Sequence, residues 1–316
     1  MRYRQLGRSG LTVSVVGLGC NNFGTRCDLR ATRVVVEAAL EAGVTLFDTA
    51  DVYGNRGGSE TLLGQVLRGR RDEVVLATKF GANMGGPPEE ARGSRRHVRR
   101  AVEASLRRLG TDHLDLYQQH VPDPKTPLEE TLATLDDLVT EGKVRYIGSS
   151  NFAAWQIAEA DWIARTEHLT RFVSAQNQYN LLERDLEYEV VPACDRYGVG
   201  ILPYFPLANG LLTGKYRRGE PGPAGTRLAG RSGLLTEEVF DRLDALEKYG
   251  VERGCTLLEV AIGGLAAQPA VGSVIAGATR PDQVLANAAA AEWEPTPEDV
   301  AELAKLAPRR PIGKHR

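Results

Sequence analysis

The feature that most constrains this 316-residue chain is a regular alternation of short apolar runs with segments that carry apolar residues at helical spacing. Most of the runs are continuous apolar stretches, which is typical of strands covered on both faces. Strict strand–helix alternation predicts a parallel sheet, and eight units predict a closed (β/α)8 barrel of the TIM type, an α/β fold. The eight predicted strands are residues 15–19, 45–48, 74–79, 114–119, 144–148, 172–176, 200–204 and 272–276.

Further segments complete the predicted architecture. Residues 3–5 and 12–14 are expected to pair as an N-terminal β-hairpin, and helices are expected over residues 128–141, 185–196 and 296–306. Glycines 43, 110, 142 and 198 fall where helices end. A long insert after the seventh strand, residues 215–233, is predicted to be a lid or ligand clasp, with a solvated surface loop as the alternative. We expect residues 1–316 to form one barrel domain.

The composition argues against several classes of protein. The 39 basic and 41 acidic side chains nearly cancel, so no field for nucleic acid or an anionic membrane is expected. No apolar run approaches the roughly 20 residues that span a bilayer, and the N-terminal residues lack the apolar core of a signal peptide. The cysteines at positions 20, 27, 194 and 255 have neither metal-ligand nor disulfide-framework spacing. These observations predict a cytoplasmic protein without a metal site.

Four residues suited to proton transfer lie at or just after the ends of three consecutive predicted strands, and they are Asp48, Tyr53, Lys79 and His120. The carboxyl ends of parallel strands share one face of the fold, so we expect these side chains to meet there. A nearby ammonium such as that of Lys79 would lower the pKa of Tyr53 from about 10, and Asp48 would hold Lys79 by an ion pair. His120 would donate a hydrogen bond to a substrate oxygen.

This set suits protonation of a developing alkoxide while another group delivers hydride to the carbonyl carbon. Each residue also has an ordinary structural interpretation. Asp48 can cap a turn, Tyr53 can be a half-buried loop aromatic, Lys79 can be a surface cation and His120 can be a core histidine. Ordinary roles for all four at successive strand ends of one barrel are much less expected than any one alone.

Polar residues also follow the later strands. Ser150 and Asn151 end the fifth strand and Gln176 ends the sixth, where they can hold a carboxamide. Tyr204 ends the seventh and offers a flat face to a heterocycle. Arg280, beside a predicted helix N-terminus, is a candidate phosphate site.

The sequence VGLGCNNFG (residues 16–24) has two of the three glycines of the dinucleotide-binding fingerprint. It does not complete the fingerprint, because Asn22 occupies the position of the third required glycine. Gly17 and Gly19 are instead expected to permit close backbone approach at the mouth of the barrel.

Taken together, these motifs resemble the aldo-keto reductase family over nearly the whole chain, and most closely its bacterial and potassium-channel β-subunit branches. The matching segments are GLG (17–19), FDTADVYG (47–54), ATK (77–79), DLYQQH (115–120), GKVRYIGSSNF (142–152), QYNLL (178–182) and LLTGKY (211–216). The tyrosine-based tetrad of that family matches Asp48, Tyr53, Lys79 and His120.

The resemblance implies an NADPH-dependent, metal-free carbonyl reductase. It implies that Ser150, Asn151 and Gln176 hold the nicotinamide carboxamide, and that Tyr204 stacks on the nicotinamide ring. Lys215 and Arg227 match cations that hold the pyrophosphate. At the adenosine-phosphate end the matching residues are Gly277, Thr279, Arg280, Gln283 and Asn287. Further cofactor contacts are expected from Gly19, Cys20, Asn21, Asp48, Phe205, Pro206, Leu207 and Gly210.

Two other functions were weighed against a reductase. In an aldolase-like barrel Lys79 would form a Schiff base, but Asp48, Gln176 and Tyr204 would then have no role. In a cofactor-binding regulatory or redox-sensing subunit turnover would be vestigial, which an intact tetrad argues against. The physiological carbonyl substrate, the direction of reaction in the cell, the strictness of NADPH over NADH and the oligomeric state are not readable from the sequence.

Overall fold

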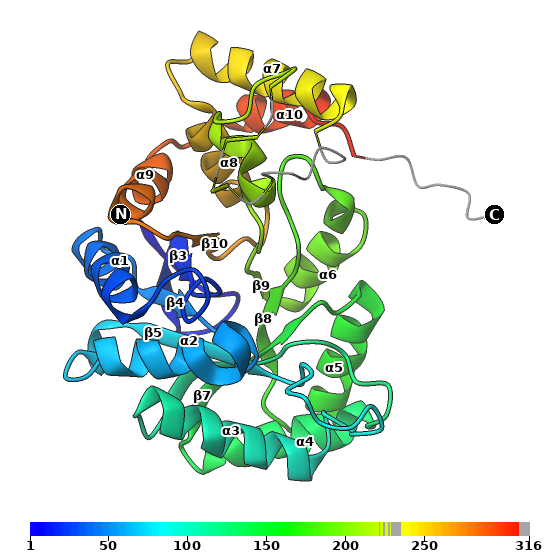
Figure 1. Cartoon of the computed structure of the whole chain (residues 1–316). Coiled ribbons are helices and arrows are strands. Elements are labelled where there is room, and N and C mark those ends of the chain that lie inside the picture. Colours follow the sequence, from blue (N-terminus) through cyan, green and yellow to red (C-terminus); the bar gives the residue numbers. More distant parts are fainter. Residues whose placement is uncertain (221, 224, 227, 229–234, 310–316) are drawn as a thin grey trace.

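The computed structural model of the protein describes residues 1–220, 222–223, 225–226, 228 and 235–309. A two-stranded antiparallel hairpin precedes eight parallel strands that curl into a barrel, with helices around the outside (Figure 1). The (β/α)8 barrel and the N-terminal hairpin are therefore confirmed. The strands are β1 Tyr3–Gln5, β2 Thr12–Ser14, β3 Val16–Gly19, β4 Leu46–Asp48, β5 Val75–Phe80, β6 Leu114–Gln119, β7 Val144–Ser150, β8 Phe172–Gln176, β9 Gly200–Ile201 and β10 Val274–Gly277.

The helices alternate with these strands. Three short 3-10 segments accompany them, at Arg71–Glu73, Asp185–Glu187 and Ala208–Thr213. In the described part of the chain no helix is both long and apolar enough to cross a bilayer. The α-helices are α1 Leu29–Glu41, α2 Tyr53–Val66, α3 Arg95–Leu109, α4 Leu128–Thr140, α5 Ala154–Thr166, α6 Val190–Tyr197, α7 Glu237–Glu252, α8 Leu257–Ala266, α9 Pro281–Ala290 and α10 Pro297–Leu306.

The barrel strands follow the order β10-β3-β4-β5-β6-β7-β8-β9. The circle closes between β9 and β10 through single backbone hydrogen bonds. The amide of Gly272 donates to the carbonyl of Ile201 at 2.8 Å, and the amide of Ile275 donates to the carbonyl of Pro203 at 3.0 Å. This order places β4, β5 and β6 side by side, and it therefore brings the ends of these three strands together.

Six of the eight predicted strands differ in their bounds. β3, β4 and β5 differ by one residue at one or both ends, and β7 runs two residues past its predicted end, to Ser150. The seventh and eighth differ as follows. The seventh was expected over residues 200–204, but β9 ends at Ile201. Pro203 has no N–H to donate on the side of β10, so the ladder cannot continue there. On the side of β8, the amides of Leu202 and Tyr204 still donate to the carbonyls of Ala175 and Asn177. The eighth was expected over residues 272–276 and lies two residues later at its start, at Val274–Gly277.

The helix ends follow the local chemistry of the sequence. The hydroxyl of Ser94 accepts a hydrogen bond from the amide of His97 at the start of α3, and Gly110 ends that helix with a left-handed φ of 65°. The helix predicted over residues 185–196 is split into the 3-10 segment Asp185–Glu187 and α6. Because Pro192 falls in the first turn of α6, its missing N–H breaks no bond there.

The insert after β9 is anchored on α7, which packs with α8 and α10 at one side of the barrel (Figure 1). Arg218 pairs with three carboxylates on one face of α7, those of Glu237, Asp241 and Asp244. Tyr216 is buried in the same apolar cluster as Phe240 of α7. The beginning of the insert is therefore held against a helix, and Arg227 and residues 229–233 of the insert lie outside the described residues.

The hairpin closes the barrel at the amino-terminal ends of its strands. Leu6 is fully buried in the apolar cluster inside the barrel, with Leu46 and Leu116. The next residue, Gly7, has a φ of 58°, and a Cβ built there would lie 2.6 Å from the carbonyl oxygen of Gly198 and 2.7 Å from the amide nitrogen of Gly200. Backbone atoms cannot move aside as a flexible side chain can, so glycine is required at position 7.

We therefore expect Gly7→Ala to lower the free energy of unfolding by about 3 kcal/mol, from left-handed strain plus the clash. Gly69→Ala is the matched control, because Gly69 has a φ of 79° but open space around it. Only the conformational cost of about 1 kcal/mol applies there. Denaturant unfolding of both variants measures the difference. Equal losses in the free energy of unfolding would show that the close approach of Gly7 to the backbone of Gly198 and Gly200 adds no cost.

Candidate active site

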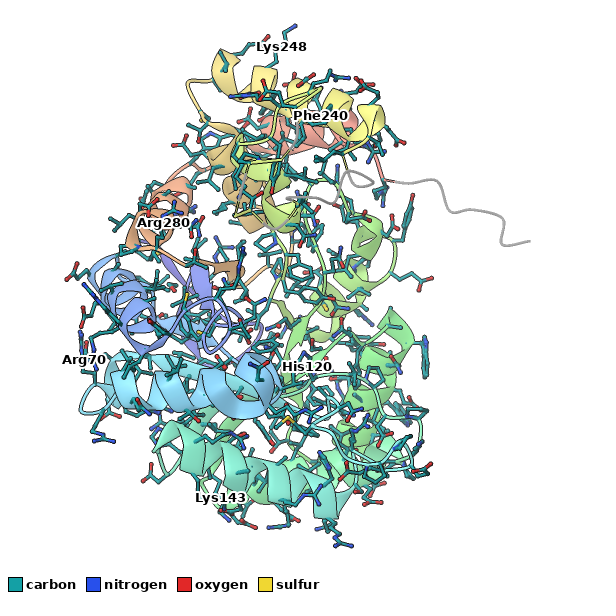
Figure 2. The ribbon with its side chains drawn as sticks, viewed as in Figure 1. Arg70, His120, Lys143, Phe240, Lys248 and Arg280 are labelled. Atoms are coloured by element: carbon teal, nitrogen blue, oxygen red, sulfur yellow. The ribbon has the colours of Figure 1, made fainter. Side chains whose placement is uncertain are left out.

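A cleft of about 800 Å³ opens at the carboxyl ends of the barrel strands, which is the usual size of a small-molecule site. In Figure 2, His120 lies near the middle of the molecule and Arg280 lies at the start of α9. The cleft runs between these regions. Of the predicted site residues that the structure describes, all but Lys79 line it: Gly19, Cys20, Asn21, Asp48, Tyr53, His120, Ser150, Asn151, Gln176, Tyr204, Phe205, Pro206, Leu207, Gly210, Lys215, Gly277, Thr279, Arg280, Gln283 and Asn287.

Behind the cleft lies a buried ion pair between neighbouring strands. The Lys79 ammonium of β5 donates to Oδ2 of Asp48 on β4 at 2.7 Å and to the carbonyl oxygen of Thr49 at 2.9 Å. Lys79 is fully buried and Asp48 nearly so. Burial by itself lowers the pKa of Lys79, but Asp48 and then Tyr53 outweigh it and the pKa is raised. Lys79 is therefore a fixed cation that no ligand in the cleft contacts directly.

Tyr53 starts α2 and is held by an unusual turn. The four residues after it, Gly54 to Gly57, all have left-handed φ values between 59° and 109°. A Cβ at Gly54 would lie 2.6 Å from the carbonyl oxygen of Phe23, so the turn packs tightly against the loop after β3. Non-glycine residues resist this conformation. The strained turn brings Tyr53 back over the strand ends, and the Lys79 ammonium lies 5.0 Å from the centre of its ring.

The net pKa of Tyr53 differs from the sequence-based expectation. Burial raises it, and this effect is larger than the lowering by the charge and hydrogen bond of Lys79; the charge of Asp48 raises it further. Lys79 therefore lowers the pKa of Tyr53 as predicted, but the effect of burial is larger. Tyr53 stays a protonated phenol at neutral pH, which is the state that can donate a proton.

His120 follows β6 and faces Tyr53. Their rings are 5.7 Å apart and nearly perpendicular, at 85°. Burial, assisted by the charge of Lys79, lowers the pKa of His120 to about 3. The imidazole is therefore neutral around pH 7, and its buried Nδ1 has no hydrogen-bond partner among the described residues. A neutral imidazole can donate one N–H to a ligand oxygen without carrying charge into the site.

Polar side chains that are linked by hydrogen bonds form another wall of the cleft. The Asn151 amide donates to the carbonyl oxygen of His120 at 2.9 Å and to the hydroxyl of Ser150 at 3.2 Å. The hydroxyl of Tyr204 donates to the Asn151 side-chain oxygen at 2.8 Å. Gln176 was predicted to hold a ligand amide, and its own amide donates to Oδ1 of Asp48 at 2.9 Å. The contacts of Asn151 join the chain at the ends of β6 and β7 to the segment after β9, and Gln176 joins the end of β8 to the end of β4.

The cleft is also lined by Arg280 and Lys215, two of the candidate phosphate cations. Arg280 is the N-cap residue of α9, is exposed, and pairs with Asp282 through two bonds of 2.9 Å and 2.8 Å. The Lys215 side chain lies across Gly210, where a Cβ would come within 2.7 Å of its Nζ. Gln283 accepts hydrogen bonds from the backbone amide and hydroxyl of Thr279. A helix N-terminus and two cations suit an anionic ligand group.

Some lining residues were not predicted. Asn22 was considered only as a failed fingerprint glycine, yet it lines the cleft and donates to the carbonyl of Ala278 at 3.2 Å. Arg26 lines it too and donates to the carbonyl of Gly225 in the insert. Both follow the carboxyl end of β3, and the strand-end rule applied to that loop would have included them. Leu258 of α8 has no such local signal.

A second cluster of charged side chains is formed by Asp51, Glu60 and Arg108. Glu60 is fully buried and accepts from Thr78 and from Arg108, each at 2.6 Å. Asp51 is also buried, and its Oδ1 has no hydrogen-bond partner among the described residues. Burial, then the charge of Glu60, raises the pKa of Asp51 to about 7. In the described ranges, no group of three or more His, Cys, Asp or Glu side chains could hold a metal ion.

Comparison with known proteins agrees with the class that the barrel and its strand-end chemistry define. Residues 15–308 match the model of the Aldo/keto reductase family. A probable voltage-gated potassium channel subunit beta from Oryza sativa subsp. japonica is 36% identical over 98% of both chains. An uncharacterized oxidoreductase, YrpG, from Bacillus subtilis (strain 168) is 39% identical over 90% of this chain and 89% of its own.

The fold and the site define a barrel enzyme whose chemistry lies at the carboxyl ends of its strands. The chain belongs to the aldo/keto reductase family, and it is an oxidoreductase.

The raised pKa of Asp51 predicts a pH-dependent stability. Between its unfolded value of 3.8 and about 7, the folded protein holds a proton that the unfolded chain has released. This group therefore makes the free energy of unfolding fall as pH rises through that window. Asp51→Asn removes the penalty, so the variant should be more stable than the wild type above pH 7 by about 2–4 kcal/mol, with little gain near pH 4.

Thermal unfolding of both proteins between about pH 5 and about pH 8 measures this effect. Asp72→Asn is the control, because Asp72 is exposed. A stability difference between Asp51→Asn and the wild type that does not change with pH would contradict the assignment.

Proposed function

We propose that this protein is an NADPH-dependent reductase that converts aldehydes or ketones to alcohols, with Tyr53 as the general acid. One observation carries the proposal. A half-buried tyrosine faces the cleft beside a neutral histidine, and a buried Lys79–Asp48 pair lies directly behind it. This arrangement stabilises a developing phenolate without exposing the cation to solvent or substrate.

The residues along the cleft fit a nicotinamide dinucleotide phosphate. Ser150, Asn151 and Gln176 supply hydroxyl and amide groups near Tyr53, which suits a carboxamide, and the ring of Tyr204 suits stacking. Lys215, with Arg227 from the insert, is proposed to hold the pyrophosphate. Arg280, at the start of α9, is proposed to hold the adenosine phosphate. Bound NADPH supplies the hydride.

The protein's own groups then manage the carbonyl oxygen. His120 donates a hydrogen bond to this oxygen and orients it, and its low pKa keeps it a neutral donor. As negative charge develops on the oxygen, the hydroxyl of Tyr53 transfers its proton there. The Lys79 ammonium stabilises the phenolate that remains, and Asp48 keeps Lys79 charged and in place.

The buried state of Lys79 argues against an aldolase. A Schiff-base lysine must reach its substrate as a neutral amine. Lys79 is fully buried, does not line the cleft and has a raised pKa. Its ammonium is already hydrogen-bonded to Asp48 and Thr49.

A regulatory role is the second candidate, and the printed names of relatives favour it. The rice relative and one from Schizosaccharomyces pombe, 35% identical over 98% of this chain and 94% of its own, are named probable and putative voltage-gated potassium channel subunits beta. A subunit of this kind would bind nucleotide and turn over slowly or not at all. Titration with NADPH followed by a panel of carbonyl compounds separates the two roles, since only a reductase consumes the nucleotide with the carbonyl.

The proposal predicts that Tyr53→Phe abolishes turnover, by at least about a thousandfold, while NADPH affinity changes little. The substitution removes the acidic hydroxyl and keeps the ring. Steady-state reduction of 4-nitrobenzaldehyde and fluorescence titration with NADPH measure the two quantities. Turnover retained in this variant would exclude Tyr53 as the acid.

Arg280 is predicted to select NADPH over NADH. Arg280→Ala removes a charged hydrogen-bond donor to a phosphate, so it should weaken NADPH binding by about 10–100-fold. NADH lacks the extra phosphate, so its binding should not change. Arg33→Ala removes a cation from the exposed face of α1 and serves as the control. Equal weakening of both nucleotides in Arg280→Ala would place the extra phosphate elsewhere.

A further inference from the structure

The Asp48 carboxylate receives more than the Lys79 ammonium. Its Oδ1 accepts two further hydrogen bonds, from the amide of Gln118 on β6 at 3.2 Å and from the amide of Gln176 on β8 at 2.9 Å. Nothing in the sequence analysis assigned Gln118 a role. The carboxylate at the base of the site is thus held from three strands, by one cation and two neutral amides.

The two amides differ in what else they can reach. Gln176 lines the cleft, so a bound ligand can compete for its N–H. Gln118 is fully buried and is not among the residues that line the cleft. Its Nε2 donates to Asp48 and a ligand cannot take it away. When Gln176 turns to a ligand amide, Gln118 is the donor that remains on Oδ1 of Asp48.

Gln118 lowers the stability of the folded protein at this position. Its side-chain oxygen is buried with no hydrogen-bond partner among the described residues, and an unsatisfied buried acceptor is destabilising. The neighbouring strand leaves room for it, since a Cβ at Gly148 of β7 would lie only 3.3 Å from Cγ of Gln118. A buried amide that costs stability and makes one bond, to the base of the active site, points to a role in chemistry.

We propose that Gln118 is a positioning residue that holds the Asp48 carboxylate in place and directed at Lys79 while the amide of Gln176 binds the nucleotide. The inference rests on the proposed reductase function. Gln118 touches neither substrate nor cofactor, and it acts through Asp48 and Lys79 on Tyr53. A neutral donor stabilises the carboxylate without adding a charge that would compete with Lys79.

The charged and titratable groups around Asp48 come from the other side. They are Lys79 on β5, Tyr53 at the start of α2 and Cys20 after β3, and each interacts electrostatically with Asp48. From β6 and β8 the carboxylate is faced by the amides of Gln118 and Gln176. A new ionisable group at position 118 would therefore be the one that titrates on that side.

The first test is Gln118→Met, which keeps the length of the side chain and removes both its donor and its unsatisfied oxygen. We expect kcat to fall about tenfold. The KM for 4-nitrobenzaldehyde and the Kd for NADPH should stay within about twofold, because Gln118 contacts neither. The melting temperature should be unchanged or higher. A fall in kcat without a fall in stability is a result that a merely structural role would not give.

Gln119→Met is the matched control. Gln119 is the next residue on β6, is nearly as buried, and also has an unpartnered side-chain oxygen. Successive side chains of a strand point to opposite faces, so Gln119 faces away from Asp48. Its substitution should leave kcat close to that of the wild type.

The second test is Gln118→Glu. A carboxyl group beside Asp48 resists ionisation, and its protonated form can donate to Oδ1 as the amide does. We expect kcat near the wild-type value at about pH 6, and a steep loss relative to wild type toward about pH 9, where two carboxylates would repel each other. The kcat of Gln118→Met should be low throughout this range.

The possible outcomes distinguish a failure of the proposed reductase function from a failure of the proposed role of Gln118. If the wild type reduces no carbonyl compound with NADPH, the proposed function fails. If the wild type is active and Gln118→Met retains its full kcat, or loses no more than Gln119→Met, the role of Gln118 is overturned. A Gln118→Glu variant whose kcat relative to wild type does not change with pH would also overturn it.

Discussion

The buried Asp48–Lys79 ion pair is the interaction on which the site depends. Removing two charges from water is costly, and the cost is offset only when the remaining donors and acceptors are satisfied. Here the ammonium also bonds the carbonyl of Thr49, and the carboxylate accepts from Gln118 and Gln176. The order of β4, β5, β6 and β8 in the barrel supplies every one of these partners. A shift of one strand by one residue would turn a partner out of the barrel.

Several features near the Asp48–Lys79 pair lower the stability of the folded protein. The left-handed turn after Tyr53 includes Arg56, whose side chain disfavours that conformation, and Asn55, which tolerates it better. Asp51 and Gln118 each keep a buried oxygen without a partner among the described residues. Asp51 precedes Tyr53 by two residues and Gln118 precedes His120 by two, so these costs fall in the segments that carry candidate catalytic residues. Strain and unmet hydrogen bonds next to such residues are typical of a site selected for chemistry.

Much of the fold and the site could be predicted because both follow strand ends. The alternation of apolar runs predicts the barrel, and each candidate catalytic residue lies at or just after the end of a strand. Other features depend on packing. The net pKa of Tyr53 is raised because burial outweighs Lys79, and burial is a tertiary property. In a strand as uniformly buried as β6, no alternation tells that Gln118 faces Asp48 while Gln119 does not. Pro203, by contrast, was a readable signal that β9 would end early.

The central claim is that the cleft directs hydride from a nicotinamide to a carbonyl carbon while Tyr53 supplies the proton. The most direct measurement is to reduce 4-nitrobenzaldehyde with NADPH deuterated at the transferring C4 position and to locate the label by NMR. The expected product carries one deuterium on the alcohol carbon and a solvent proton on the oxygen. Alcohol that forms without deuterium on carbon, or no reduction of any carbonyl despite tight NADPH binding, would contradict it.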